Sequence, residues 1–315
     1  MRVLIIGSGV NGALVGAALV EGGAEVTFLT RPSRQRQLIT TGLHITSPLG
    51  RFRKPVHAVA PSKRVGGPLD VKGAVDVLVV AARAHNYQMG LFAVRDVITP
   101  ETLIVPTFDG VHHLSDWRER YPRNAVALAA VDVRATVDAD GIVRQIAPMG
   151  LLRLGSRSVS AVEKISKLCD ALVGRRFRAE QCGDDVLRHV WARAIFRAAA
   201  AGASRLAGIP LRDAIRFHSK KPFTAMLDEG VRTAEAHRVR GVREAVTRYR
   251  DGFLREGEPI QAPAPIEAGD RARAEARFLL GNMLRKAEDG KVDAQYLQRA
   301  WVGRVTADLG HPVAT

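Results

Sequence analysis

Residues 7–12, GSGVNG, directly follow the apolar run VLII at residues 3–6. The apolar run predicts a buried strand, and residues 13–21 predict a helix that ends at the two glycines 22–23. Residues 25–29, EVTFL, predict a second strand. Strand, glycine turn, helix and strand in this order form a βαβ unit, which predicts a Rossmann-type fold and a dinucleotide site.

Each glycine of the turn has a distinct expected role. Gly7 permits the tight turn, Gly9 lets the backbone approach a pyrophosphate, and Gly12 allows the helix to pack closely. The N–H groups at the helix start, which include those of Val10 and Asn11, are directed at the phosphates together with the positive end of the helix dipole. The alternative is a glycine-rich turn that holds no ligand.

The end of the second strand indicates which nucleotide binds. An NAD site usually has Asp or Glu there to accept a hydrogen bond from the ribose 2′-OH. This chain has Thr30 and Arg31, followed by Arg34 and Arg36. A guanidinium binds a 2′-phosphate that a carboxylate would repel, so the sequence predicts NADP(H). The alternative is that these arginines form a solvated basic loop.

Length and composition indicate a globular protein of two domains. The chain has 315 residues, of which 46% are hydrophobic. No stretch approaches the roughly 18 apolar residues of a membrane span, and a chain that begins on a required strand leaves no room for a signal peptide. Cys169 and Cys182 do not have the spacing of metal ligands. We expect a cytoplasmic protein without a bound metal.

The net charge of +15 raises the question of nucleic-acid binding. The excess is distributed over both halves of the chain, with no basic arm or tail, and aromatic residues make up only 5%. Few aromatic side chains leave little for base stacking. We interpret the charge as solvated surface that attracts an anionic cofactor and a small anionic substrate, and we expect neither nucleic acid nor a membrane as a partner.

The predicted elements change in character near residue 183. Before it, apolar runs predict strands at 75–82, 103–107, 125–133, 142–154 and 177–180, with a hairpin turn at 138–141 and a helix at 160–173. After it, helices are predicted at 184–206, 222–239, 271–289 and 293–308, and the segment 252–269 is predicted to be irregular. The fold class is therefore α/β, with a Rossmann-type doubly wound parallel sheet at residues 1–182 and an all-helical substrate or dimerisation domain at 183–315.

Five motifs in this order resemble the ketopantoate reductase (2-dehydropantoate 2-reductase) family over nearly the full chain. They are the glycine motif with Arg31, the run DVLVVAARA at 76–84, TFDGV at 107–111, WAR at 191–193, and NMLR at 282–285 followed by GK at 290–291. The resemblance implies reduction of a 2-oxo acid by NADPH. In the family, a helix lysine supplies the proton, and asparagines and a serine hold the substrate.

The resemblance also shows where this chain departs from the family. Arg193 stands in place of the catalytic lysine, and an arginine stays charged at ordinary pH, which makes it a poor proton donor. It can still anchor a carboxylate and polarise a carbonyl. Arg197 and Ala201 replace asparagines, Asp109 replaces the asparagine near the nicotinamide, and Asn282 replaces the substrate-binding serine. A substrate-binding glutamate of the family finds only Asp293, one residue out of register.

Arg83 replaces the lysine that follows the family's third strand. Either cation can hold a phosphate or a ribose of the cofactor, so we expect Arg83 to bind the cofactor.

The substitutions form a pattern on the helix predicted at 184–206. His189, Arg193 and Arg197 recur every four residues and share one face. If this face lines the cleft, as the resemblance implies, it binds an anionic substrate through Arg197 together with Asn282. The alternative is that these three residues are the solvent face of an amphipathic helix.

Without the lysine, another residue must give the proton. His112 and His113 follow Asp109 at the carboxyl end of a predicted strand, where α/β folds bind ligands. A histidine titrates near neutral pH, and Asp109 could orient one of them. His189 is the other candidate. We therefore assign Arg193, Asp109, His113 and His189 as the candidate catalytic residues.

The sequence as a whole predicts an NADP(H)-dependent oxidoreductase that acts on an oxo or hydroxy acid other than ketopantoate. A homodimer formed through the helical domain is a further expectation. The competing hypothesis is an NADP-binding sensor or regulator with little catalytic activity, because the cofactor motif is kept while the acid–base residues are replaced.

Overall fold

The computed structural model describes residues 1–61, 71, 73–82, 87–107, 110–111, 116–156, 158–172, 174, 176–208, 214, 220–256 and 270–303. The chain forms two compact units. One consists of residues 1–108 and 113–187, and the other of residues 109–112 and 188–315. Each unit is described by itself below.

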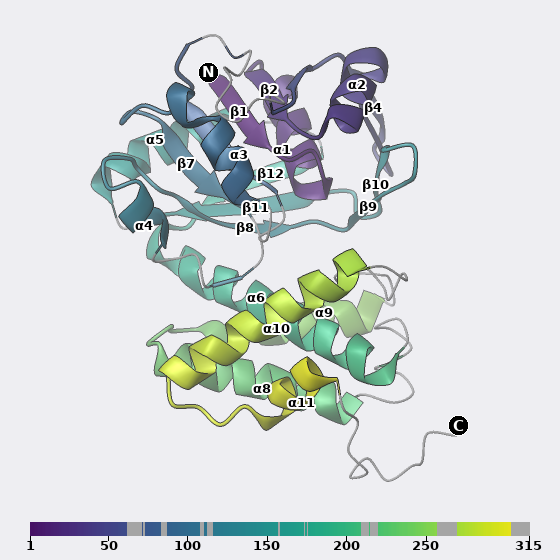
Figure 1. The fold of residues 1–315 in the computed structure, drawn as a ribbon, viewed down its shortest axis with the longest axis vertical. Coiled ribbons are helices and arrows are strands. Elements are labelled where there is room, and N and C mark those ends of the chain that lie inside the picture. The colour runs from purple at the N-terminus through teal and green to yellow at the C-terminus, as the bar shows by residue number, and fades with distance from the viewer. Residues whose placement is uncertain are drawn as a thin grey trace. The chain divides into compact units, whose positions relative to one another are not determined.

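All strands among the described residues lie in the first unit (Figure 1). Its elements in chain order are β1 (Arg2–Ile6), α1 (Val10–Glu21), β2 (Glu25–Leu29), α2 (Pro32–Thr41), β3 (Leu43–Ser47), β4 (Gly50–Lys54), β5 (His57–Val59), β6 (Val77–Val80), α3 (Tyr87–Ala93), η1 (Arg95–Val97), β7 (Leu103–Pro106), α4 (Asp116–Arg120), β8 (Leu128–Asp132), β9 (Ala135–Val137), β10 (Val143–Gln145), β11 (Gly150–Gly155), α5 (Val159–Ala171), β12 (Phe177–Gln181), η2 (Gly183–Asp185) and the start of α6 (Val186–Ala207).

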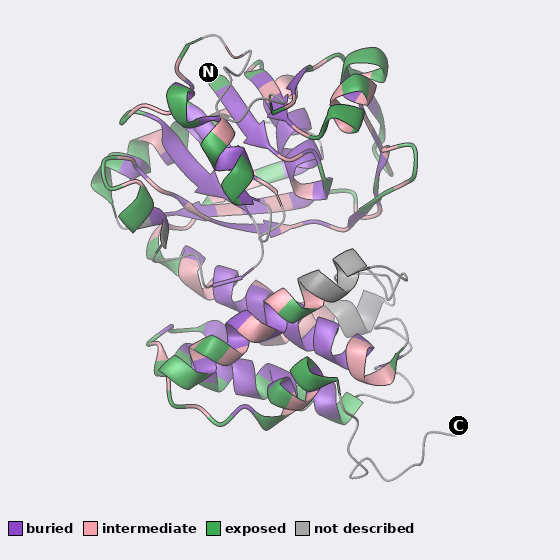
Figure 2. Cartoon of the chain, in the orientation of Figure 1, coloured by how far each residue is buried: buried purple, intermediate pink, exposed green. Residues whose placement is uncertain are grey.

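The central sheet has the strand order β5-β2-β1-β6-β7, and all its pairs are parallel. Alternate residues of β1 point to opposite faces. Val3 and Ile5 join a core with α1 and α5, whereas Leu4 and Ile6 join a second core with α3 and α4. With helices on both faces, β6 and β7 are apolar and buried throughout, and β1 is so beyond its first residue (Figure 2). The predicted doubly wound parallel sheet is confirmed.

Two smaller sheets complete this unit, one with the order β4-β3-β10-β9 and one with the order β12-β11-β8. Arg176, which is buried, links them: its Nη1 donates to Glu21 Oε1 of α1 at 2.8 Å, and its Nε donates to Ser47 Oγ of β3 at 3.2 Å. The predicted turn at 138–141 is present, but it joins β9, which was not predicted, to β10. The single strand predicted at 142–154 is wrong, because β10 and β11 are separate strands in different sheets, and β11 pairs antiparallel with β8.

Several elements of this unit were not predicted: α2, the β3–β4 hairpin, β5, α3 and α4. Their sequences lack strong periodicity. Helix α2 buries only Leu38 and is otherwise largely exposed, and β4 alternates charged residues with the single buried Phe52. Such segments depend on tertiary contacts for their structure, and propensity alone does not identify them.

The second unit is helical, and its described elements are most of α6, α8 (Lys220–Ala236), α9 (Val242–Glu256), α10 (Asp270–Asp289) and α11 (Gln295–Val302). The predicted all-helical second part is thereby confirmed. The irregular segment predicted at 252–269 is wrong for residues 252–256, which continue α9, and its remainder lies outside the described residues. Helix α11 stops at Gly303, a left-handed cap, before the predicted end at 308.

Most residues of α6 are buried, and many of them are alanines, whose small side chains let neighbouring elements come close. Phe196 packs edge-on against Phe223 of α8, with ring centroids 5.9 Å apart, and the Trp191 and His237 rings lie 5.4 Å apart. A Cβ on Gly230 of α8 would come within 2.6 Å of Ile195. Close packing of small residues therefore holds α6 against α8. No helix among the described residues is long and apolar enough to cross a membrane.

Glu229 is a buried carboxylate that caps a helix other than its own. It lies on α8 and accepts hydrogen bonds from the backbone N–H groups of Tyr296 and Leu297, at 2.8 and 2.9 Å, in the first turn of α11. Burial raises the pKa of Glu229, and these two hydrogen bonds oppose the shift. The carboxylate supplies acceptors for N–H groups that have no partner within α11.

We expect Glu229→Ala to lower the free energy of unfolding by about 2 kcal/mol, because two buried N–H groups lose their acceptors. Urea denaturation followed by circular dichroism measures the change. Asp228→Ala is the control: Asp228 is the exposed neighbour on the same helix, and its loss should change stability by no more than about 0.5 kcal/mol. Equal effects of the two substitutions would contradict the capping role.

Candidate functional site

The turn between β1 and α1 has the geometry expected of a phosphate-binding turn. Gly7 has a φ of +98°, which favours glycine, and its N–H donates to Leu29 O at 2.9 Å. A Cβ on Gly7 would lie 2.9 Å from Ala81 O and Ala82 N. The turn is thus wedged between the ends of β2 and β6 and accepts only glycine at this position.

The other two motif glycines differ in what surrounds them. A Cβ on Gly12 would overlap the carbonyl oxygen of Gly7, so this position is sterically closed. A Cβ on Gly9 would meet nothing within 4 Å. The space beside Gly9 is open to a ligand that approaches the backbone, as the sequence analysis expects for a pyrophosphate. The close contact of helix with strand is made by Gly16, which the sequence analysis missed and whose Cβ would overlap the Phe28 ring.

The start of α1 presents N–H groups without intrahelical partners. Gly9 is the N-cap and receives no side-chain cap, and the first turn carries no acidic residue. The helix dipole is therefore not neutralised locally, and the N–H groups of Val10 and Asn11 suit an anion. The Asn11 side chain has a separate task, because its Nδ2 donates to Thr107 O at 3.1 Å and ties the turn to the end of β7.

The end of β2 is basic and carries no carboxylate. Arg31 is exposed and is the N-cap of α2, which begins with Pro32. Arg34 and Arg36 lie on this helix and not in a loop, and Arg36 is exposed like Arg31, so the alternative of solvated arginines is not tested by the fold. Thr30 Oγ1 lies 2.9 Å from Ser8 Oγ of the glycine turn. Neither hydroxyl was predicted to have a role, although Ser8 belongs to the glycine motif and Thr30 to the end of the second predicted strand.

Four predicted site residues lie outside the described residues: Arg83, Asp109, His112 and His113. Their roles stay predictions. Gly110, which is described, has a φ of +124° and follows the end of β7 in a glycine-favouring turn.

The basic residues of α6 are not its solvent face. His189 is 8% exposed, Arg197 is 9% exposed, and Arg193 between them is partly buried. The alternative of a solvated stripe does not agree with this burial. The basic side chains at these consecutive turns of α6 are therefore largely enclosed by the protein.

Asn282 on α10 is 2% exposed. Its Oδ1 accepts a hydrogen bond from Arg285 Nη2 at 3.0 Å, while its Nδ2 has no hydrogen-bond partner among the residues that the structure describes. Buried polar groups are nearly always paired. A polar ligand group is one partner that would satisfy this amide, which agrees with its predicted role in substrate binding.

Cys169 does not have the properties of a catalytic nucleophile. Burial raises the pKa of Cys169 to about 11, so its thiol stays protonated at neutral pH. Within the described ranges, no group of three His, Cys, Asp or Glu side chains is placed to hold a metal ion.

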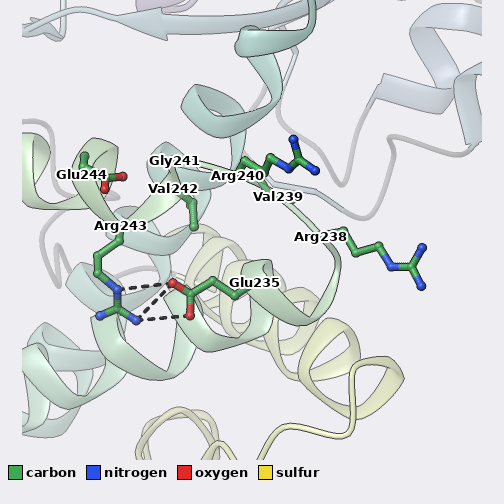
Figure 3. Close-up of a pocket in the computed structure, with 8 residues that line it drawn as sticks. All are labelled: Glu235, Arg238, Val239, Arg240, Gly241, Val242, Arg243 and Glu244. Carbon is green, nitrogen blue, oxygen red and sulfur yellow. Dashed lines mark hydrogen bonds and ion pairs between the residues drawn. The ribbon is translucent and has the colours of Figure 1, made fainter.

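A pocket of about 560 Å³ lies at the turn between α8 and α9 (Figure 3). The Glu235–Arg243 ion pair, at 3.2 Å, lies on one side of it, and Arg238 and Arg240 point away. Arg238 has a φ of +60° and ends α8 at a position that usually holds glycine. None of the predicted site residues lines this pocket.

Residues 3–158 match the model of the family described as ketopantoate reductase PanE/ApbA. The uncharacterized oxidoreductase YkpB of Bacillus subtilis (strain 168) is 26% identical over 211 residues, which is 67% of each chain.

Two solved structures share the fold over nearly the whole length. A D-mandelate dehydrogenase in complex with NADH and anilino(oxo)acetate has a TM-score of 0.82 at 16% identity and covers 96% of both chains. A 2-dehydropantoate 2-reductase from Methylococcus capsulatus has a TM-score of 0.73 at 21% identity, with 96% of this chain and 95% of that chain covered.

The difference between Gly9 and Gly12 is testable. Gly9→Ala should leave the unfolding midpoint unchanged and weaken dinucleotide binding about tenfold or more, because the methyl group enters the open space beside the backbone. Gly12→Ala should instead lower stability by about 1–3 kcal/mol, since its methyl group overlaps Gly7 O. Thermal unfolding and titration with a reduced dinucleotide check both. A Gly9→Ala variant that binds the dinucleotide as tightly as the wild type would refute the expectation that the pyrophosphate approaches the backbone at Gly9.

Proposed function

We propose, because the chain belongs to the ketopantoate reductase family, that it is an NADP(H)-dependent oxidoreductase that acts on an oxo or hydroxy acid other than ketopantoate. The observation that carries the proposal is the open cradle at Gly9 beside a strand end that bears arginine and no carboxylate. Family membership supports oxidoreductase chemistry in general. The cofactor and the substrate class are inferred from the residues of this chain.

The residues present fit a dinucleotide. The pyrophosphate would bind at the backbone of Gly9, Val10 and Asn11, where the N–H groups are available and no side chain fills the space. When bound, the nicotinamide supplies or accepts the hydride. The β1–α1 turn and the ends of β2 and β6 then serve to position the cofactor.

The choice of NADP(H) over NAD(H) rests on the end of β2. Thr30 stands where an NAD site has its carboxylate, and Arg31 is exposed at the start of α2, free to contact a 2′-phosphate. The N-terminus of α2 adds the positive end of its dipole and has no acidic residue in its first turn. The D-mandelate dehydrogenase of the same fold was solved with NADH, so the fold alone does not select the nucleotide.

The substrate is inferred to be an anion. Arg193 and Arg197 replace the lysine and an asparagine of the family, and both place a permanent positive charge on a largely buried helix. Such charges bind a carboxylate and polarise a carbonyl oxygen. They do not reproduce the neutral amide contacts that the family uses for ketopantoate. Asn282 Nδ2 offers a further donor.

The proton must come from a residue other than Arg193, which stays charged. His189, one turn earlier on the same helix, is the candidate among the described residues. His113, beside Asp109, is the second candidate. Replacing each histidine by asparagine and measuring the pH dependence of kcat distinguishes them, because only loss of the true donor removes a titration near neutral pH.

The direct test is oxidation of NADPH, followed at 340 nm, with a panel of 2-oxo acids. The panel contains ketopantoate, 2-oxo dicarboxylates and 2-oxo acids with an aryl substituent. The aryl acids are included because one protein of the same fold is a D-mandelate dehydrogenase. We expect turnover with an acid other than ketopantoate. Tight NADPH binding without turnover of any 2-oxo acid, together with no oxidation of the matching 2-hydroxy acids by NADP⁺, would refute the enzyme proposal.

Arg31→Glu should raise the Kd for NADPH by about 10- to 100-fold, because a carboxylate replaces a charge-assisted contact to the 2′-phosphate. The Kd for NADH should change by less than about threefold, since NADH lacks that phosphate. Fluorescence titration of the reduced nucleotides measures both constants. Equal weakening of the two would exclude the proposed role of Arg31.

Arg193→Ala should lower kcat/KM for the acid substrate about a hundredfold, through loss of the charge that polarises the carbonyl. Arg240→Ala is the matched control, because Arg240 is an exposed arginine of the same unit and lies outside the α6 face. Its kcat/KM should stay within about twofold of the wild type. An Arg193→Ala enzyme with unchanged kcat/KM would show that α6 does not contact the substrate.

A further inference from the structure

Arg34 contacts the glycine turn from the first turn of α2. Its Nε donates to Ser8 Oγ at 3.4 Å, and its Nη1 donates to Gln37 Oε1 one turn further along α2. Arg31, three residues earlier, is exposed, whereas Arg34 is partly buried. Arg31 therefore extends into solvent, whereas Arg34 is held by contacts with the protein.

The β9–β10 hairpin holds the Arg34 guanidinium in place. A Cβ on Gly141, in the turn of this hairpin, would overlap Arg34 Nη1 and come within about 2.8 Å of the Gln37 amide nitrogen. Gly141 has a φ of +72°, so the turn requires glycine for its backbone as well. The hairpin turn thus covers the guanidinium and prevents it from swinging into solvent.

The positive charge of Arg34 is only partly compensated by its surroundings. Burial lowers the pKa of Arg34, and the carboxylate of Asp138 opposes that shift. Asp138 is itself engaged, because it accepts from Ile142 N at 2.9 Å and pairs with Arg144 at 2.9 Å. Arg34 Nη2 is buried and has no hydrogen-bond partner within the described part of the chain. A half-buried cation of this kind favours a nearby anion.

The contact with Ser8 gives the neighbouring hydroxyl pair a direction. Ser8 Oγ and Thr30 Oγ1 are 2.9 Å apart, and either could donate. The Arg34 cation beside Ser8 Oγ turns the Ser8 O–H dipole away from itself, towards Thr30. Thr30 Oγ1 then accepts from Ser8, and its own proton is left to donate outward from the end of β2.

We propose that Arg34 is a positioning residue for nucleotide choice, which orients the Ser8–Thr30 hydroxyl pair so that Thr30 presents a donor to the 2′-phosphate of the cofactor. The inference rests on the proposed NADP(H) preference and adds a residue to it. A phosphate oxygen only accepts hydrogen bonds, so an outward donor favours it. Arg31 contacts the phosphate from the solvent side, and Arg34 acts through Ser8 and Thr30 from the protein side.

The test uses two ligands that differ only by the 2′-phosphate: adenosine 2′,5′-bisphosphate and adenosine 5′-monophosphate. Calorimetric titration of the full chain gives the Kd for each, and the ratio of the two constants measures the preference for the phosphate. Arg34→Gln should reduce this ratio about tenfold. Arg36→Gln is the matched control, because Arg36 is an exposed arginine of the same helix. It removes the same charge and should change the ratio by less than about twofold.

A double-mutant cycle separates positioning from a general charge effect. Thr30→Val should reduce the ratio in the wild type. It should have little further effect in the Arg34→Gln background, because the relay, the hydrogen-bond chain from Arg34 through Ser8 to Thr30, is already lost. Additive effects of the two substitutions would overturn the inference, as would equal effects of Arg34→Gln and Arg36→Gln. Either result would leave the NADP(H) preference itself intact.

A wild-type protein that binds both ligands equally would overturn the NADP(H) preference and the inference together. Thermal unfolding of each variant reports whether it folds. If Arg34→Gln does not fold, Ser8→Ala tests the same relay, since it removes the atom between Arg34 and Thr30. Ser8→Ala should reduce the ratio as Thr30→Val does, and an unchanged ratio would refute the relay.

Discussion

The insertion of β1 between β2 and β6 is the constraint on which the nucleotide half of this protein depends. The backbone ladders continue beyond the strands: Gly7 N donates to Leu29 O, Ala81 N to Ile6 O, and Thr107 N to Val80 O, all at 2.8–2.9 Å. Parallel strands in one register end at one edge of the sheet. The glycine turn, the basic end of β2 and the end of β7 are therefore brought together by hydrogen bonds of the main chain.

Hydrogen bonds from polar side chains then fix the position of the glycine turn at this edge of the sheet. Asn11 fastens the glycine turn to Thr107, and Arg34 links the same turn to the β9–β10 hairpin. Neither contact makes the fold, which the apolar faces of β1 and the parallel ladder already specify. Each restricts how the turn can present its N–H groups to a phosphate. Preorganised donors of this kind bind an anion without further cost of ordering.

In the helical unit, close packing of small residues coexists with buried basic side chains. Alanines along α6 and Gly230 of α8 permit close packing, and His189 and Arg197 are buried on this alanine-rich helix. Basic groups are seldom retained in such surroundings unless they have partners or bind a ligand. The glycine turn lies within residues 3–158, which match the ketopantoate reductase family model, whereas α6 lies outside that match.

The sequence by itself determined the βαβ unit, the later strands β6 and β7 of the central sheet, the glycine turn and the helical second part, because each depends on local periodicity and on glycine where no Cβ fits. Helix α2 and the β3–β4 hairpin were not recognisable from the sequence, since their pattern is weak and their stability comes from contacts with distant segments. Helix α9 was not predicted either, although its apolar residues recur at helical spacing. Only the tertiary structure decided that the α6 face is buried, that Gly16 makes the close helix–strand contact, and that Arg34 is held while Arg31 is free. These facts depend on distances between residues far apart in the chain, which no local pattern encodes.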